Sequence, residues 1–298
     1  MTSITGRVTP FPSYAGLRES SLLLRTVAQI TRNRLATASF GFVLLLVLVA
    51  LLAPVITPYD PLALDKKANL QAPSFDHPLG TDQRGRDIFS RLIYASRISL
   101  SVGIVAVLLS TVVGVPVGLM AGYFRGTTDT ILMRILDALL AFPPILLAMA
   151  IVTIIGPGST NAMVAVAVTG IPTFARLARA STLSQVELDY VTAARAIGAG
   201  PWRIIFRSIL PNAFAPVLVQ MSLAVAYAIL LEAALSFFGL GTQPPTPSWG
   251  AMLSEARGYL HLAPWYAIAP GVIITLLVLA LNTFTDGLRD ALDPSHQH

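Results

Sequence analysis

Long uncharged stretches alternate with shorter polar ones along most of the chain. The first covers residues 35–56, which are 22 consecutive positions without Asp, Glu, Lys or Arg. A second covers residues 98–124, which are 27 consecutive positions without Asp, Glu, Lys or Arg; Arg97 directly precedes them. Because an α-helix needs about 20 predominantly apolar residues to cross a bilayer, this pattern predicts membrane-spanning helices at 35–56 and 98–124.

The second half of the chain continues the pattern. Residues 138–175 carry no charge, but the turn-forming sequence GPGSTN at 156–161 interrupts them. Gly170 and Pro172 lead us to expect an irregular end to the helix that follows this turn. Further helices are predicted at 131–155, 162–179, 213–238 and 264–285. The expected fold class is an all-α integral membrane protein with six transmembrane helices.

Composition supports a membrane protein and narrows its chemistry. Only 12% of the 298 residues are charged, against roughly a quarter in soluble domains. The absence of cysteine excludes disulfides and thiolate metal sites. The two lysines, Lys66 and Lys67, follow no phosphate-binding glycine pattern, so we expect no nucleotide site in this chain. The sequence also lacks the HExxH and GxSxG patterns, which argues against an intramembrane hydrolase.

The distribution of positive charge predicts the orientation. Thirteen of the twenty Lys and Arg residues fall in the two terminal segments, the 122–134 turn and the 176–207 loop. Since Lys and Arg concentrate in cytoplasmic loops, both termini are predicted to be cytoplasmic. The predicted order is a cytoplasmic arm with an interfacial helix (1–34), the first span (35–56), an external loop (57–97), a five-helix core (98–286) that includes a cytoplasmic loop (180–212), and a cytoplasmic tail (287–298).

One of the cytoplasmic segments has a pattern of its own. This segment, Asp189–Asn212, is called the coupling stretch below and reads DYVTAARAIGAGPWRIIFRSILPN. Its three arginines place it outside lipid. Helical spacing puts Tyr190, Ala193, Ala194 and Ile197 on one face, and later Trp202, Ile205, Phe206 and Ile209 on another. The sequence GAGP between them predicts two short amphipathic helices joined at a glycine hinge, the second helix ending before Pro211.

The coupling stretch resembles the cytoplasmic signature loop of ABC importer permeases, in which EAA is followed by a glycine and then by Leu-Pro. Ala193, Ala194, Gly198, Leu210 and Pro211 fit, whereas Thr192 replaces the usual glutamate, so no role of that carboxylate is carried over. The resemblance implies that this loop docks into a partner ATPase. The residues expected at that contact are Tyr190, Ala193, Ala194, Ile197, Gly198, Arg203, Leu210 and Pro211. A plain interfacial loop with arginines near lipid headgroups is the alternative, and flanking lipid-length segments disfavour a soluble DNA-binding helix-turn-helix.

Three other strings resemble the dipeptide and oligopeptide branch of these permeases, and with the coupling stretch they cover most of residues 77–294. They are HPLGTDQRGRDIFSRLIYASRISL from His77, EAALSFFGLGTQPPTPSWGAML from Glu232, and NTFTDGLRDALDP from Asn282. We find no such signal in the first thirty or so residues. Asp82 and Asp87 lie close enough in sequence to Arg86, Arg91 and Arg97 to pair with them, so a lid or structural clamp on the membrane surface is favoured over a binding site there. The string from Glu232 to Leu253 is predicted to be an ordered, non-helical external loop.

Two carboxylates lie within predicted spans, where a charge costs about 2.5–3.5 kcal/mol at a helix centre on insertion scales. Asp137 lies in the third predicted helix and Glu232 near the outer end of the fifth. Both could line a substrate path. Alternatively, Asp137 pairs with Arg134 on its own helix, and Glu232 reaches external water. No metal site is expected.

The resemblance implies a type I ABC importer permease fold and a transport subunit, not an enzyme, in a bacterial plasma (inner) membrane. The substrate would be a dipeptide or short oligopeptide; glutathione or a nickel chelate are same-branch alternatives. The implied partners are a second homologous permease, two ATPases that hold ATP and magnesium, an extracytoplasmic substrate-binding protein and membrane lipid, but no nucleic acid. An ion-coupled secondary transporter, which needs carboxylates deep in the bundle, and a receptor or scaffold are the competing classes.

Overall fold

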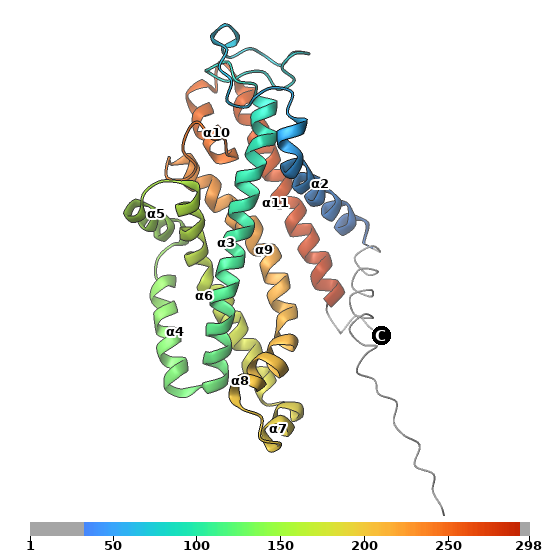
Figure 1. Ribbon diagram of the computed structural model, residues 1–298, viewed down its shortest axis with the longest axis vertical. Helices are drawn as coiled ribbons and strands as arrows, with labels where there is room; N and C mark the ends of the chain where they lie inside the picture. The colour runs from blue at the N-terminus through green and yellow to red at the C-terminus, as the bar shows by residue number, and fades with distance from the viewer. Residues whose placement is uncertain (1–32, 293–298) are drawn as a thin grey trace, which may run out of the picture.

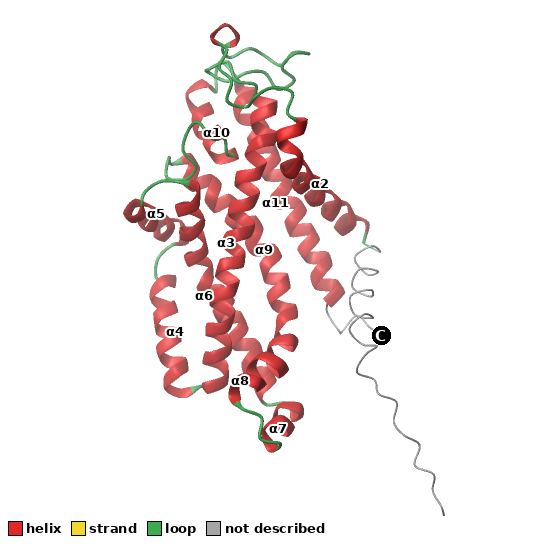
Figure 2. Cartoon of the chain, in the orientation of Figure 1, coloured by secondary structure: helices red, strands yellow, loops and turns green. Residues whose placement is uncertain are grey.

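The computed structural model describes residues 33–292, and every regular element in this range is a helix (Figures 1 and 2). Five helices are long and apolar enough to cross a membrane, or six if the bent pair α4 and α5 forms one span. The long helices are α2 (Arg34–Ile56), α3 (Ile88–Phe124), α4 (Gly126–Leu140), α5 (Pro144–Ile155), α6 (Ser159–Val186), α9 (Leu210–Phe237) and α11 (Pro264–Leu292). The arm predicted at 1–34, which includes the interfacial helix, lies outside the described residues except for its last two positions.

Short helices lie at the two ends of this bundle. At the lower end in Figure 1 are α7 (Asp189–Ala196) and α8 (Pro201–Arg203), which continues into a π-helical segment, η2 (Ile204–Ile209). At the upper end are α10 (Trp249–Ala256) and the loop of residues 57–87. Two 3₁₀ turns, η1 (Lys66–Ala68) and η3 (Arg257–Tyr259), complete the described elements.

The centre of the fold is the contact between α3 and α6, which run side by side. Glycines at every fourth position of α3 face α6: Gly114, Gly118 and Gly122. A Cβ atom on Gly118 would lie 2.1 Å from the carbonyl oxygen of Ala175. Small residues let membrane helices approach this closely and gain van der Waals contact, which takes the place of the hydrophobic effect between helices in lipid.

The first and last described helices pack against each other. The rings of Phe40 on α2 and Phe284 on α11 lie 5.3 Å apart, and a Cβ atom on Gly287 would meet Ala36. The start of α2 therefore lies beside the end of α11. The predicted span 35–56 agrees with α2 within one residue.

The predicted limits of three helices need correction. The second helix starts at Ile88 instead of 98, because Asp87 accepts a hydrogen bond from the Ser90 amide (2.7 Å) and Arg91 is buried by ion pairs. The helix predicted at 162–179 runs without a break from Ser159 to Val186, although Pro172 lies inside it. The last helix extends beyond 285 to Leu292.

The third predicted span, 131–155, is broken. α4 and α5 meet at an angle of 89°. Pro143 and Pro144 stand at the break, where Pro144 takes the first helical position that its fixed φ suits. A proline in a helix interior removes one backbone hydrogen bond, and two in succession separate α4 from α5.

The loop predicted to be non-helical between Glu232 and Leu253 also needs correction. Its first six residues complete α9, and α10 begins at Trp249, where the Ser248 hydroxyl accepts a hydrogen bond from the Ala251 amide (3.2 Å). Trp249 is 1% exposed, and its indole nitrogen donates to the carbonyl of Leu92 (3.1 Å). Only residues 238–248 are non-helical.

Candidate coupling surface and transport path

The first helix of the coupling stretch presents one of its faces to solvent. On α7, Val191 is fully buried, while Tyr190 and Ala193 are exposed, as is Ile197 directly after the last residue of the helix. Ile197 is 85% exposed, a fraction that only Phe75 exceeds among the large apolar side chains of the described residues. Ala194, which the periodicity assigns to the same face, instead packs partly against the core. An exposed apolar face of this kind is a mark of an interaction site.

Gly198 forms the turn after α7. Its φ is +78°, a conformation that L-residues rarely adopt, and a Cβ atom there would meet nothing within 4 Å. The predicted glycine hinge thus coincides with a backbone turn that requires glycine and opens onto free space.

The second helix predicted in the coupling stretch does not stop before Pro211. α8, η2 and α9 form one continuous helical segment from Pro201 to Phe237. The Leu210 amide bonds to the carbonyl of Ile205, five residues back, and this wider turn gives room for a proline ring that a regular α-helix would exclude. Leu210 is partly buried against the core and Pro211 is exposed.

The four residues predicted to share one face of this second helix differ in their exposure. Ile205 and Ile209 are fully buried, whereas Trp202 and Phe206 are 53% and 48% exposed and stack on each other with ring centroids 6.1 Å apart. Arg203 is exposed and forms no ion pair with any residue that the structure describes. The end of the bundle therefore presents apolar rings beside a positive charge.

Aromatic contacts join the coupling stretch to the end of α3. The rings of Phe124 and Trp202 meet edge to face at 5.9 Å, and the Arg195 guanidinium lies 5.5 Å from the centre of the Tyr123 ring. A motion of α7 and α8 would therefore act on α3 as well as on α9.

Asp137, a candidate for the substrate path, does not pair with Arg134 as the alternative predicted. Its carboxylate accepts a hydrogen bond from Arg176 on α6 at 2.5 Å, and both side chains are about half exposed (55% and 54%). Nearer to the start of α4, Asp129 accepts two hydrogen bonds from Arg179, at 2.5 and 2.6 Å. These two ion pairs link α4 to α6. The sequence pattern does not reveal Arg176 as the partner because it is 39 positions away.

Glu232, the other candidate, is fully buried and does not reach water as its alternative proposed. The Ser236 hydroxyl donates to its carboxylate at 2.7 Å, and the Ser99 hydroxyl of α3 approaches it at 3.3 Å. The same two hydroxyls accept hydrogen bonds from the amides of Thr242 and Trp249. Glu232 thus holds the 238–248 loop against α3 and α9.

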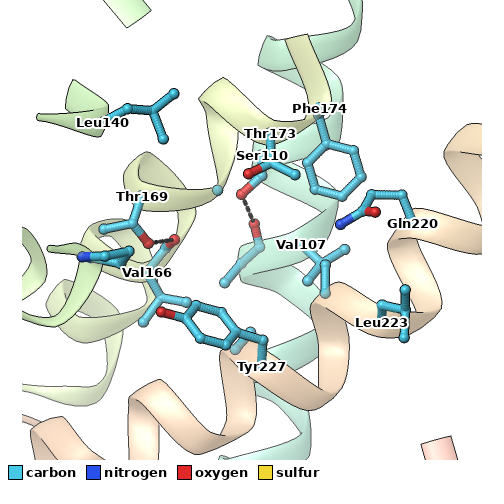
Figure 3. Close-up of a pocket in the computed structure, with 15 residues that line it drawn as sticks. Val107, Ser110, Leu140, Val166, Thr169, Thr173, Phe174, Gln220, Leu223 and Tyr227 are labelled. Carbon is cyan, nitrogen blue, oxygen red and sulfur yellow. Dashed lines mark hydrogen bonds between the residues drawn. The ribbon is translucent and has the colours of Figure 1, made fainter. Parts of the chain in front are cut away.

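A cavity of about 310 Å³ opens between α3, α6 and α9, with the end of α4 and the start of α5 at its edge (Figure 3). Its walls are mostly apolar, and no charged residue of the described chain lines it. The polar side chains at the cavity come from three helices; they are Ser110, Thr169, Thr173, Gln220 and Tyr227. A search for charged groups in the spans overlooks all five. The sequence feature that could have indicated this cavity is Gln220, a glutamine within a largely apolar helix.

The end of the bundle away from the coupling stretch holds a buried ion cluster, called the cap cluster. Its members are Asp82, Arg86, Arg91, Glu255 and Tyr266. Arg86 is 1% exposed and bonds to Asp82 at 2.6 Å and to Glu255 at 2.8 Å. Glu255 also accepts from Arg91 (3.0 Å) and from the Tyr266 hydroxyl (2.6 Å). The predicted pairing of Asp82 with arginines is confirmed, but Asp87 instead contacts His77 at 2.9 Å. The cluster ties the 57–87 loop to α3, α10 and α11, as a structural clamp does.

Comparison with known families gives two matches. Residues 114–297 match the family described as binding-protein-dependent transport system inner membrane component. Residues 21–73 match the N-terminal transmembrane domain of oligopeptide transport permease C. The second match corrects the expectation that the first thirty or so residues carry no family signal, since it begins at residue 21.

Several curated proteins are similar over most of their length. A glutathione transport system permease protein, GsiD, of Pectobacterium atrosepticum is 49% identical, with 88% of each chain covered. A dipeptide transport system permease protein, DppC, of Haemophilus influenzae is 46% identical, and the match covers 88% of this chain and 91% of that protein. A di/tripeptide transport system permease protein, DppC, of Pseudomonas aeruginosa is also 46% identical, with 88% of each chain covered.

The fold has a solved counterpart. A chain from inward-facing structures of the MetNI methionine ABC transporter aligns with a TM-score of 0.57 and 20% identity, covering 68% of this chain and 97% of that one. At this identity the likeness concerns the fold alone. The family match over most of the chain, the relatives at 46–49% identity and the shared fold agree, and the chain belongs to the family of binding-protein-dependent transport system inner membrane components, in its dipeptide and oligopeptide permease branch.

Proposed function

We propose that this chain is the permease subunit of an ATP-driven importer of dipeptides or short oligopeptides. The observation that carries this proposal is the 46–49% identity, over 88% of the chain, to permeases named for dipeptide, di/tripeptide and glutathione transport. Glutathione is itself a short peptide and remains the alternative substrate. None of these three relatives supports the nickel-chelate alternative.

The energy would come from partner ATPases, which would hold the ATP and magnesium, and this chain would have no nucleotide site of its own. The coupling stretch is the proposed docking surface, through Tyr190, Ala193, Ile197, Gly198 and Arg203. Its support is the exposed apolar face of α7, the exposed guanidinium of Arg203 and the open space beside Gly198. Leu210 and Pro211, the first two residues of α9, would lie behind this surface and support it.

The shape of the fold suggests how a push on this surface would reach the other end of the bundle. The helical segment from Pro201 to Phe237 has 37 residues and so spans about 55 Å at 1.5 Å per residue. A displacement at Trp202 would therefore be carried along α9 to Glu232, whose hydrogen bonds reach α3 and the 238–248 loop. We propose that this lever alternates the access of the path between the two membrane faces.

The complete transporter would contain a second homologous permease, two ATPases and an extracytoplasmic substrate-binding protein, all in or at a bacterial inner membrane. Nothing in this proposal calls for nucleic acid. Both termini and the coupling stretch would face the cytoplasm, and the 57–87 loop the outside, since positive residues concentrate at the coupling end.

The ion-coupled alternative is less well supported. It needs a carboxylate free to bind an ion deep in the bundle, but Asp137 is paired with Arg176 and Glu232 accepts from hydroxyl groups. The receptor or scaffold alternative does not account for an exposed coupling surface of the importer type.

Affinity purification from the native membrane tests the proposed function. We expect a tagged chain to bring down a second permease and two ATPase subunits. We also expect the complex to hydrolyse ATP faster when the substrate-binding protein and peptide are added. A chain that purifies alone, under conditions that preserve a control ABC complex, would contradict the proposal.

A further inference from the structure

Three polar side chains at the cavity between α3, α6 and α9 have no hydrogen-bond partner in the described chain. The other two have partners: the Ser110 hydroxyl is within hydrogen-bond distance of the carbonyls of Ala106 (2.8 Å) and of Ala167 on α6 (2.7 Å), and the Thr169 hydroxyl donates to the carbonyl of Val166 at 2.7 Å. Thr173, Gln220 and Tyr227 make no such bond within residues 33–292. Their donors and acceptors are therefore open to a group from outside this chain.

These side chains lie on matching helix faces. On α6, Thr169, Thr173 and Arg176 follow one another at i, i+4 and i+7, and on α9 Gln220 and Tyr227 are seven residues apart. Figure 3 shows Gln220 and Tyr227 extending from α9 and Thr169 and Thr173 from α6 at the edges of one cavity. The polar groups thus form a surface along two helices instead of isolated points.

Lipid is a poor occupant of this surface. Gln220 lies within α9, ten residues after its first residue, Leu210, and an unpaired amide facing hydrocarbon there would carry a heavy free-energy cost. By contrast, the exposed residues Ile268, Val272, Leu276 and Leu279 form an apolar stripe on α11, and the hydroxyl of Thr275 beside them donates to the carbonyl of Gly271 (2.8 Å). α11 therefore offers a surface suited to lipid, and the cavity face offers one suited to water and polar solutes.

The lining also defines which chemical groups fit. The described residues around the cavity include none that is charged, so they cannot pair the charged ends of a peptide. The side chains of Thr173, Gln220 and Tyr227 can both donate and accept hydrogen bonds, as an amide group requires. Apolar walls lie beside them, formed by Val107, Phe174 and Leu223. An amide flanked by small apolar groups matches both features.

We propose that Thr173, Gln220 and Tyr227 form a contact site for the uncharged amide portion of a passing peptide, and that Gln220 helps to set which peptides pass. The assignment rests on the proposed peptide import and adds to it a site that reads neutral groups. Asp137 and Arg176, which pair across α4 and α6, each lie three positions, or about one helical turn, from the lining residues Leu140 and Thr173 and border this site.

A charge introduced at Gln220 tests the site through selectivity. In the reconstituted complex, Gln220→Glu should shift the uptake ratio of Ala-Lys to Ala-Asp about tenfold towards Ala-Lys, and Gln220→Lys should shift it in the opposite direction. Gln71→Glu, an exposed position in the 57–87 loop with the same change of charge, should leave the ratio unchanged. A merely structural role would lower both uptakes by the same factor. Equal losses, or no change at all, would overturn the site.

Cysteine labelling tests the same site independently of selectivity, because the chain has no native cysteine. A charged, water-soluble methanethiosulfonate reagent should modify Thr173→Cys and Gln220→Cys in the assembled complex, but not Leu279→Cys on the apolar face of α11. Ala-Ala, if it is transported, should slow the modification of Gln220→Cys several-fold. Absence of labelling would mean that a partner chain or lipid covers the cavity, and labelling that a transported peptide does not slow would exclude contact; either result overturns the site.

The outcomes separate this assignment from the proposed function. A wild-type complex that takes up no peptide contradicts the proposed function and removes the basis of the assignment. A complex that takes up peptide, while its selectivity is insensitive to charge at Gln220, contradicts the assignment alone.

Discussion

At the scale of single residues, Gly198 has two properties that make it informative. Its backbone conformation requires glycine, and the space beside it within this chain is empty. A side chain there would project into whatever docks on the coupling stretch. Gly126 shares both properties, with a φ of +55° and nothing within 4 Å of the position that a Cβ atom would take, but it lies in the α3–α4 turn outside the coupling stretch.

We expect Gly198→Asp to reach the membrane in normal amounts but to abolish coupled uptake, because an unpaired charge pressed into a protein interface costs several kcal/mol. Gly126→Asp, which imposes a comparable backbone strain of about 1–2 kcal/mol, should retain most of the uptake. Uptake and membrane abundance of the two variants are measured side by side. Wild-type uptake in Gly198→Asp would show that this surface does not receive the ATPase.

The ion pair between Asp137 and Arg176 permits a second residue-level prediction. Each single substitution, Asp137→Asn or Arg176→Gln, leaves one charge unpaired beside the cavity, and we expect it to lower uptake at unchanged membrane abundance. The double variant should recover most of the uptake, whereas Arg134→Gln should have little effect because Arg134 is not the partner. Loss in Arg134→Gln, together with a silent Arg176→Gln, would refute this pairing in the working transporter.

At the scale of elements, the sequence predicted where helices lie better than how they end. Hydropathy is a local property, so the span 35–56 agrees with α2 within a residue. Helix ends depend on tertiary contacts: α3 starts early because Arg91 finds Glu255, which is 164 positions away. Pro211 does not end a helix because the preceding π-helical turn accommodates it. Tertiary contacts also explain why the sequence did not predict the cavity residues, because Arg176 and Gln220 acquire their roles only through neighbours on other helices.

The cap cluster provides a prediction at this scale. Arg86→Met removes one of the two guanidinium groups that neutralise Asp82 and Glu255, the other being that of Arg91, and breaking a buried ion pair costs about 3–5 kcal/mol. We expect a clearly lower midpoint of thermal unfolding in detergent. Arg84→Met, an exposed neighbour without an ion pair to any described residue, should leave the midpoint within error. Equal midpoints for the two variants would show that the cluster is not a clamp.

The orientation of the elements is tested with single cysteines. A membrane-impermeant thiol reagent added outside intact cells should label Ser74→Cys and Thr246→Cys, both exposed at the cap end. It should label Ile197→Cys only after the cells are permeabilised. Ile197 is preferred to Ala199 for this test because its side chain is more exposed. External labelling of Ile197→Cys would reverse the proposed orientation.

At the scale of the whole molecule, the described chain has the features of one part of a larger assembly. It has a surface suited to a partner at one end and the cap cluster at the other. Between them lies a cavity at which three polar side chains have no hydrogen-bond partner among residues 33–292. The apolar stripe of α11 suits lipid, whereas the α4, α6 and α9 side carries ion pairs and a glutamine. We therefore expect the second permease to face that side, so that the path is enclosed by protein.

The most direct test is uptake by liposomes that contain the complete complex. With ATP enclosed alongside the ATPase domains and the substrate-binding protein on the other side, radiolabelled peptide should accumulate only when ATP is hydrolysed. Dissipating ion gradients should not reduce this accumulation, and Gly198→Asp should abolish it. Accumulation that proceeds without ATP and follows an imposed ion gradient would contradict the central claim that this chain is the permease of an ATP-driven importer.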